Sequence, residues 1–284
     1  MNRPRVQLVV TGDDFGYCPR RDQGIVEAFL AGALTGVSLL VNGASADTAA
    51  QLARRHRIPA GLHANLSEGR PVNPNLGSEA SLIGPGGFFL GKMGFRKALA
   101  EGRVEMPQVR EELLAQFSRF QDLLGHAPAH VDGHQHVHVL PGVRQVFAEV
   151  LREHGVRYTR VPVEPGLRSC EWLEPQLRTF ALAVEEDARA AKEAFQELGL
   201  RDGLNEGSSR FPPGVVPSPE GAGCRPSHLQ GMGRRGPKSE NGRHLCAPGR
   251  GFWSPAALPP TSPQYLAQSC LCFWTCLLPR PKVA

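Results

Sequence analysis

The chain has 284 residues, enough to bury a sizeable core in one large or two modest domains. Its net charge of +5 is unevenly distributed, because residues up to Leu204 contain 23 Lys and Arg against 24 Asp and Glu, whereas residues 205–284 contain 9 against 3. The near-neutral first part argues against a nucleic-acid-binding domain, which would carry a clustered basic face.

The segment 205–284 also differs from the rest in composition. It contains 13 of the 25 prolines and five of the seven cysteines, and its Pro- and Gly-rich runs lack helical or strand periodicity. We therefore expect residues 1–204 to form the folded domain and residues 205–284 to be a disordered, low-complexity tail. Cys270, Cys272 and Cys276 do not supply the two ligand pairs of a typical zinc site, and the apolar segment around them is too short to cross a bilayer.

Features of the amino terminus and the cysteines bear on location. No apolar signal-peptide core precedes the first strand-like run, and Cys18 and Cys170 are the only cysteines of residues 1–204, which excludes a disulfide framework. These features predict a soluble intracellular protein, cytoplasmic by default, without a membrane segment. The sequence does not indicate an oligomeric state.

The first quarter of the chain alternates short apolar runs with amphipathic segments. The patterns predict strands at Val6–Val10, Gly36–Val41 and Ala60–Leu66, and helices at Asp22–Leu30 and Ala46–Arg55. A polar loop, Thr11–Asp14, is expected after the first strand.

A loop rich in Gly, Pro, Ser and Asn is expected from Ser67 to Gly94, and loops of this length often cover a functional site. Beyond it, the patterns predict a helix at Pro107–Leu124, a strand at Ala129–Asp132, a helix at Val143–His154, a strand at Val156–Val161 and a final helix at Val184–Leu198. Strands that alternate with helices predict an α/β fold with a parallel sheet or barrel.

The segment His130-Val-Asp-Gly-His-Gln-His-Val-His138 holds four of the ten histidines within nine residues, together with one carboxylate. In an extended conformation, alternation puts five polar side chains on one face: His130, Asp132, His134, His136 and His138. Such a face is costly to bury unless a cation or hydrogen-bonding groups compensate it. The stripe therefore indicates a metal site, and a solvated His-rich loop is the alternative.

Three distant positions should meet near this stripe. Asp13 and Asp14 follow the first predicted strand, His63 lies in the third, and His134 follows the next. Because loops at the carboxyl ends of parallel strands share one face, we expect convergence on a carboxylate and two imidazoles that leave positions open for water. On extended backbone the side chains of Asp13 and Asp14 would point apart, so that one could ligate a metal while the other faces the substrate. A turn or helix-capping role is the alternative for the aspartate pair, and a core histidine is the alternative for His63 taken alone.

Four sequence blocks carry a resemblance to a known family. Thr11-Gly-Asp-Asp-Phe-Gly16, Val41-Asn-Gly43, Gly61-Leu-His63 and the segment from His130 to His138 resemble, in order and approximate spacing, the blocks of the YdjC/ChbG-like carbohydrate deacetylases. The resemblance covers about Val6 to Leu200. It implies a distorted (β/α) barrel of the polysaccharide-deacetylase kind and the removal of N-acetyl groups from amino sugars in oligosaccharides.

The resemblance also implies roles for individual residues. Asp14, His63 and His134 would bind a divalent metal, magnesium in the family, and Asp13 would accept a proton from the attacking water. The acetylated oligosaccharide would be the partner, without nucleic acid or membrane.

The other residues of the stripe would support these ligands. His130 and Asp132 would lie behind the ligands or replace one of them, and His136 or His138 would orient them by hydrogen bonds. Imidazole ligands fit zinc, nickel, cobalt or manganese better than magnesium, which prefers oxygen, so the metal stays open.

The resemblance ends near Leu200. The family continues with further barrel elements and a His-Pro-Gly block placed to serve the leaving amine, and residues 201–284 contain neither. We therefore expect an incomplete barrel with impaired activity and a replaced C-terminus, as an alternative transcript would produce. The alternative is a non-catalytic metal-binding or regulatory protein acting through its tail. A metal-dependent phosphoesterase is disfavoured, because no Gly-rich phosphate cradle accompanies the ligands.

Overall fold

The computed structural model describes residues 9–164, 166–170 and 172–202. A four-stranded parallel sheet organises this part of the chain, with the order β1 (Thr11–Phe15), β2 (Gly36–Leu39), β3 (Ala60–Ala64) and β4 (Val131–Gly133). Because the spatial order follows the chain order, each crossover steps in the same direction, as in a (β/α) barrel and unlike a doubly wound sheet. The predicted α/β fold with a parallel sheet is confirmed.

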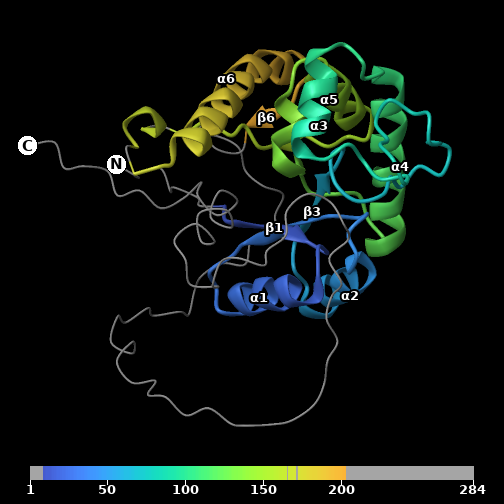
Figure 1. Cartoon of the computed structure of the whole chain (residues 1–284). Helices are drawn as coiled ribbons and strands as arrows, with labels where there is room; N and C mark the ends of the chain where they lie inside the picture. Colours follow the sequence, from blue (N-terminus) through green and yellow to red (C-terminus); the bar gives the residue numbers. More distant parts are fainter. Residues whose placement is uncertain (1–8, 165, 171, 203–284) are drawn as a thin grey trace, which may run out of the picture. The chain divides into compact units, whose positions relative to one another are not determined.

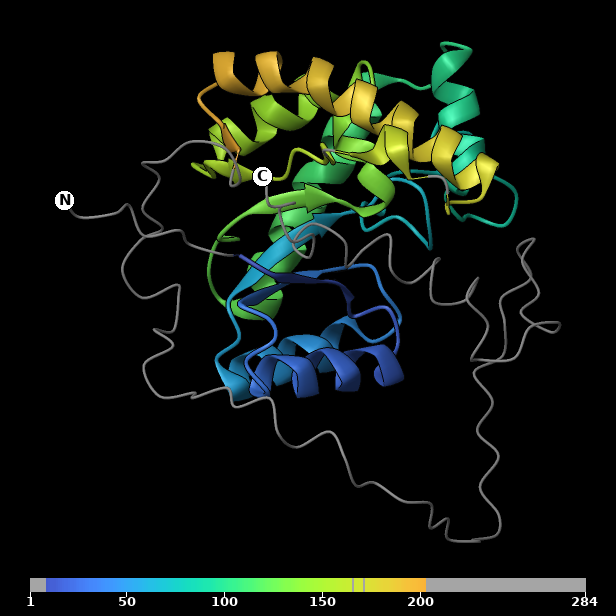
Figure 2. The same cartoon turned by 90° about the vertical axis from the view of Figure 1, so that its left-hand side faces the viewer.

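The helices follow one another around this sheet (Figures 1 and 2). They are α1 (Pro19–Leu30), α2 (Ala46–His56), α3 (Lys92–Ala100), α4 (Met106–Leu124), α5 (Val143–Glu153) and α6 (Pro175–Glu197). Apart from α3, each contacts the next along the chain, so that α1 meets α2, α2 meets α4, α4 meets α5 and α5 meets α6. Two 3-10 helices, η1 (His134–Val139) and η2 (Leu167–Ser169), and a second parallel pair, β5 (Tyr158–Thr159) and β6 (Arg201–Asp202), complete the described elements.

Burial of apolar side chains explains why these segments adopt their positions. Strands β2, β3 and β4 are buried along their whole length, as expected for a parallel sheet covered by helices. The stripe predicted for α4 faces the core, with five buried side chains at helical spacing: Val109, Leu113, Phe117, Phe120 and Leu124. Helix α4 thereby covers β3, the strand that carries His63.

The first strand and one helix differ from the sequence prediction. The strand predicted at Val6–Val10 is displaced along the chain: Val9 and Val10 precede β1, which is formed by Thr11–Phe15 and so includes the predicted loop Thr11–Asp14. Its polar side chains are tolerated because other polar groups inside the protein pair with them, as described below. Helix α3 was missed, since Gly91 and Gly94 interrupt the apolar pattern, but it buries Phe95 and Ala98. The strand expected at Val156–Val161 shortens to β5.

The His-rich segment is not extended throughout, so the prediction that five polar side chains share one face is wrong. Strand β4 ends at Gly133, and the following 3-10 helix contains Gln135 and His136 in the left-handed region, with φ of 53° and 60°. The ring of His138 folds back onto Gly133, where an added Cβ would lie 2.5 Å from Nδ1 of His138. The chain therefore turns where alternation assumed a straight strand.

The predicted disordered tail at residues 205–284, with its five cysteines, lies outside the described residues. In the part of the chain that the structure describes, no helix is both long enough and apolar enough to cross a membrane. Cys18 and Cys170 are free thiols.

The close approach of His130 to β3 yields a stability prediction. A Cβ at Gly61 would lie 2.4 Å from the ring of His130, so Gly61→Ala should lower the free energy of unfolding by about 1–3 kcal/mol through overpacking. Gly24→Ala is the matched control, since no described atom beyond its chain neighbours and the backbone of its own helix α1 lies within 4 Å of its Cβ position, and it should raise stability by about 0.5–1 kcal/mol. Urea unfolding measures both changes, and equal effects would contradict the packing described here.

Candidate metal centre

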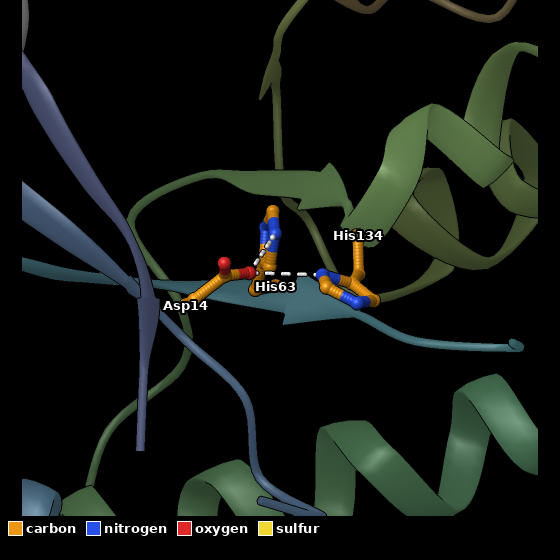
Figure 3. A group of neighbouring side chains, drawn as sticks. All are labelled: Asp14, His63 and His134. Carbon is orange, nitrogen blue, oxygen red and sulfur yellow. Dashed lines mark hydrogen bonds and ion pairs between the residues drawn. The ribbon is translucent and has the colours of Figure 1, made fainter. Parts of the chain in front are cut away.

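Three of the residues singled out in the sequence meet at the carboxyl edge of the sheet (Figure 3). Asp14 comes from β1, His63 from β3, and His134 is the first residue of η1. Oδ1 of Asp14 lies 2.9 Å from Nδ1 of His134 and 3.3 Å from Nε2 of His63. One ligand atom from each of the three residues lies within 4.8 Å of the others, and all three side chains are buried. The expected convergence of distant segments is therefore present.

Strained backbone places one of these side chains, that of Asp14. The register between β1 and β2 shifts between Gly12 and Phe15, and Asp14 adopts the left-handed conformation with φ of 61°. Such irregularities redirect a side chain from its ordinary position along a strand. Non-glycine residues in this region cost about 1–3 kcal/mol and persist where surrounding contacts fix them, commonly at functional sites.

Each imidazole is held by a carboxylate on the side away from Asp14. Nδ1 of His63 lies 2.7 Å from Oδ1 of Asp132, and Nε2 of His134 lies 2.9 Å from Oε2 of Glu68. A carboxylate that accepts one ring N–H leaves the other ring nitrogen to a metal. The opposite nitrogens, Nε2 of His63 and Nδ1 of His134, are the ones that face Asp14.

Asp13 points away from Asp14 and meets Arg160. The guanidinium donates to both carboxylate oxygens, with distances of 2.5 Å to Oδ2 and 2.6 Å to Oδ1. The same guanidinium lies 2.8 Å from Oδ2 of Asp132. Asp13, His63 and Asp132 form a second group of close ligand atoms, but Arg160 already supplies positive charge to both carboxylates. Asp14 also meets a guanidinium, but Arg21 contacts only its Oδ2, at 2.5 Å, and leaves Oδ1 facing the two imidazoles. The group around Asp14 is therefore the better candidate for a metal.

His130 and Asp132, considered as runner-up ligands, occupy different places. Nε2 of His130 lies 2.9 Å from Oγ of Ser38, which in turn donates to Asp132 at 3.0 Å. Asp132 contacts His63 directly, whereas His130 reaches the centre only through Ser38. His130 is therefore separated from the metal group by two side chains.

His136 and His138 do not orient the candidate ligands, which corrects the sequence-based expectation. His138 is fully buried, its Nε2 donates to the backbone carbonyl of Arg160 at 2.8 Å, and its ring lies against Phe147 and Phe195. Nδ1 of His136 is buried and has no hydrogen-bond partner among the described residues. The turn in η1 carries both rings away from the face that the extended strand would have presented. Asp132 and Glu68 hold the imidazoles instead.

Sequence reasoning missed Arg160 and Glu68. Each is a single charged residue without a pattern around it, Arg160 in a predicted strand and Glu68 in a predicted loop. The one available signal was position, because Arg160 directly follows β5 and Glu68 lies four residues beyond β3, at the edge where the ligands were expected.

The acidic and imidazole side chains of the centre shift one another's pKa. Burial alone would raise the pKa of Asp14, but hydrogen bonds from His134 and His63 hold it well below its usual range. Burial would lower the pKa of His63, but the charge of Asp132 and the hydrogen bond to it raise that pKa to about 10. A pocket that stabilises positive charge on two imidazoles also suits a divalent cation. A carboxylate with two imidazoles is a common donor set for zinc, nickel, cobalt or manganese.

Comparison with known proteins identifies the family. Residues 7–242 match the model of the YdjC-like protein family. The chain belongs to the YdjC-like family. The match extends beyond Leu200, where the resemblance seen in the sequence ended.

Relatives of this YdjC-like chain are named as deacetylases. It is 69% identical over 201 residues to the Homo sapiens carbohydrate deacetylase, covering 71% of this chain and 62% of the relative. It is 57% identical over 201 residues to the Danio rerio carbohydrate deacetylase, covering 71% and 64%. The Klebsiella pneumoniae chitooligosaccharide deacetylase is 38% identical over 152 residues, covering 52% and 57%. The chain thus spans less than two thirds of the length of these relatives.

Burial of His138 yields a prediction on pH and stability. Burial lowers the pKa of His138 from 6.5 to about 4, so the fold holds the ring neutral while the unfolded chain protonates it. The contribution of the neutral His138 ring to the free energy of unfolding should therefore be complete above pH 6.5 and fall by roughly 3 kcal/mol as the pH drops to about 4. Urea unfolding of the protein at pH 7.5, 6, 5 and 4 measures this slope.

His138→Gln should flatten that slope, whereas His126→Gln, which changes an exposed histidine, should leave it as in the unaltered protein. An identical slope in all three proteins would contradict the buried, neutral His138.

Proposed function

We propose that this chain is a metal-dependent hydrolase that removes N-acetyl groups from acetylated carbohydrates. The observation that carries the proposal is the buried group of Asp14, His63 and His134 beside a second, separately held carboxylate, Asp13. A ligand group and an adjacent base are the two parts that metal-assisted amide hydrolysis requires. The names of the deacetylase relatives support the same reaction and an acetylated oligosaccharide as substrate.

In this proposal, Asp14, His63 and His134 would hold one divalent cation, which would supply Lewis-acid catalysis and lower the pKa of the attacking water. The family resemblance favours magnesium. The two imidazoles favour zinc, nickel, cobalt or manganese, because magnesium prefers oxygen ligands.

Asp13 is the proposed proton acceptor. Asp13 is buried, and the guanidinium of Arg160 donates hydrogen bonds to both of its oxygens. These bonds fix the carboxylate in position, and the positive charge of Arg160 compensates its negative charge. As water attacks the acetamide carbonyl, Asp13 takes its proton, and the products are acetate and the free amine of the sugar. Asp132 keeps His63 in place during the reaction, and Arg160 joins Asp132 to Asp13.

The leaving amine also needs a proton. The family resemblance implies a His-Pro-Gly block for this role, and residues 201–284 do not contain it. We therefore expect this chain to release acetate about 10²- to 10⁴-fold more slowly than a chain that has the block. We also propose an intracellular, cytoplasmic location and a C-terminus that arises from an alternative transcript.

Metal content and acetate release on purified protein test the function. His63→Ala and His134→Ala should each abolish stoichiometric binding of a divalent metal, whereas Asp13→Asn should keep the metal and lose acetate release from N-acetylated chito-oligosaccharides by roughly 10²- to 10⁴-fold. Glu79→Gln, a change of an exposed carboxylate, is the control and should alter neither.

Absence of acetate release with every divalent metal tried would contradict the enzymatic proposal. Bound metal without release would favour the alternative, a metal-binding or regulatory protein that acts through residues 205–284. Deleting those residues would then abolish partner binding and leave the metal in place.

A further inference from the structure

Glu68 is the half-exposed member of the pair of carboxylates that hold the imidazoles. Its side chain is 38% exposed, whereas the side chain of Asp132, which holds His63, is 1% exposed. Asp132 is fixed by β4, but Glu68 lies in the long connection between β3 and α3. A loop carboxylate can hold His134 steadily only if its own backbone is restrained.

Two asparagines provide that restraint. The backbone N–H of Glu68 donates to Oδ1 of Asn65 at 3.0 Å. Its carbonyl accepts from Nδ2 of Asn65 at 2.8 Å and from Nδ2 of Asn42 at 3.0 Å. Asn65 also donates to Oδ1 of Asn42 at 3.1 Å. Asn42 and Asn65 follow β2 and β3, so the sheet itself fixes the position of Glu68.

The carboxylate of Glu68 meets two neighbours from η1. Oε2 of Glu68 lies 2.9 Å from Nε2 of His134, and the carboxylate also hydrogen-bonds with the side chain of Gln135. Oε1 of Gln135 accepts from the hydroxyl of Ser67 at 2.9 Å, so the amide nitrogen of Gln135 is the group left to donate to Glu68. Gln135 itself adopts the left-handed conformation, with φ of 53°.

We propose that Glu68 is a positioning residue of the metal centre, which accepts the Nε2–H of His134 and so presents Nδ1 of that ring to the cation. We propose further that Asn42 acts on the centre through Glu68. Both statements rest on the proposed metal site at Asp14, His63 and His134. They give a role to the Val41-Asn-Gly43 block, which contributes no ligand.

The chemistry of imidazole explains why such a residue is needed. A neutral ring carries one proton, and the partner of the protonated nitrogen decides which nitrogen is left for a metal. In this centre His63 and His134 present opposite nitrogens to Asp14, so each needs its own carboxylate. Removing such a partner typically lowers metal affinity about 10- to 100-fold.

Zn²⁺ binding to the full chain, measured by competition with a chromogenic chelator, tests the proposal. Glu68→Ala should weaken binding about 10- to 100-fold. Glu68→Gln should weaken it less, because the amide oxygen still accepts from His134. Glu79→Gln removes a charge from an exposed position in the same connection and should leave the affinity unchanged.

A double-mutant cycle tests the role of Asn42. Asn42→Ala should weaken Zn²⁺ binding on its own but add little in the Glu68→Ala background, because both changes remove the same restraint. Long-range ¹H–¹⁵N spectra of the zinc-loaded protein should show an Nε2–H on His134 that is protected from exchange, and Glu68→Ala should remove this protection. A purely structural role would not change that signal selectively.

If the unaltered protein binds Zn²⁺ and Glu68→Ala binds it with the same affinity, the role of Glu68 is overturned but the proposed metal site is not. An unaltered protein that binds no Zn²⁺ would overturn the metal site and this inference together. Additive losses in the Asn42 and Glu68 double variant would overturn the action of Asn42 through Glu68. If Glu68→Ala does not fold, Glu68→Gln replaces it, with a smaller loss of Zn²⁺ affinity expected, and an unchanged affinity in Glu68→Gln would then overturn the inference.

Discussion

The burial of Asp132 is the constraint on which the rest of the site depends. Its Oδ1 lies 2.7 Å from His63, and its Oδ2 lies 3.0 Å from Ser38 and 2.8 Å from Arg160. Burial would raise the pKa of Asp132, but the charges of Arg160 and His63 hold it well below its usual range. An unpaired charge at this depth would cost several kcal/mol. The partners of Asp132 come from different strands: Ser38 lies in β2, His63 lies in β3, and Arg160 directly follows β5. Correct pairing of the strands therefore also assembles the site.

The second determinant is strained backbone that surrounding hydrogen bonds hold in place. The turn after Asp14 is fixed by Asp22, whose Oδ1 accepts from the N–H of Gly16 at 2.7 Å and whose Oδ2 accepts from Ser45 at 2.5 Å. Gln135 is fixed on the other side by its contact with Ser67. The left-handed residues on both sides of the centre are thus held by groups from neighbouring elements, which keeps Asp14 and His134 facing each other.

Sequence reasoning succeeded where one local pattern or one topological rule decided the structure. Helical spacing identified the buried face of α4, and the rule that parallel strands end at one edge brought Asp14, His63 and His134 together. It failed where tertiary contacts decided. Alternation cannot reveal that β4 ends at Gly133, and nothing local marks Glu68 as the partner of a histidine that lies 66 residues further along the chain.

Anomalous diffraction from crystals grown with Mn²⁺ or Zn²⁺ would test the central claim most directly. We predict a single strong peak within bonding distance of Oδ1 of Asp14, Nε2 of His63 and Nδ1 of His134. A peak beside Asp13 and Asp132 with Arg160 displaced, or no peak among these side chains, would contradict it.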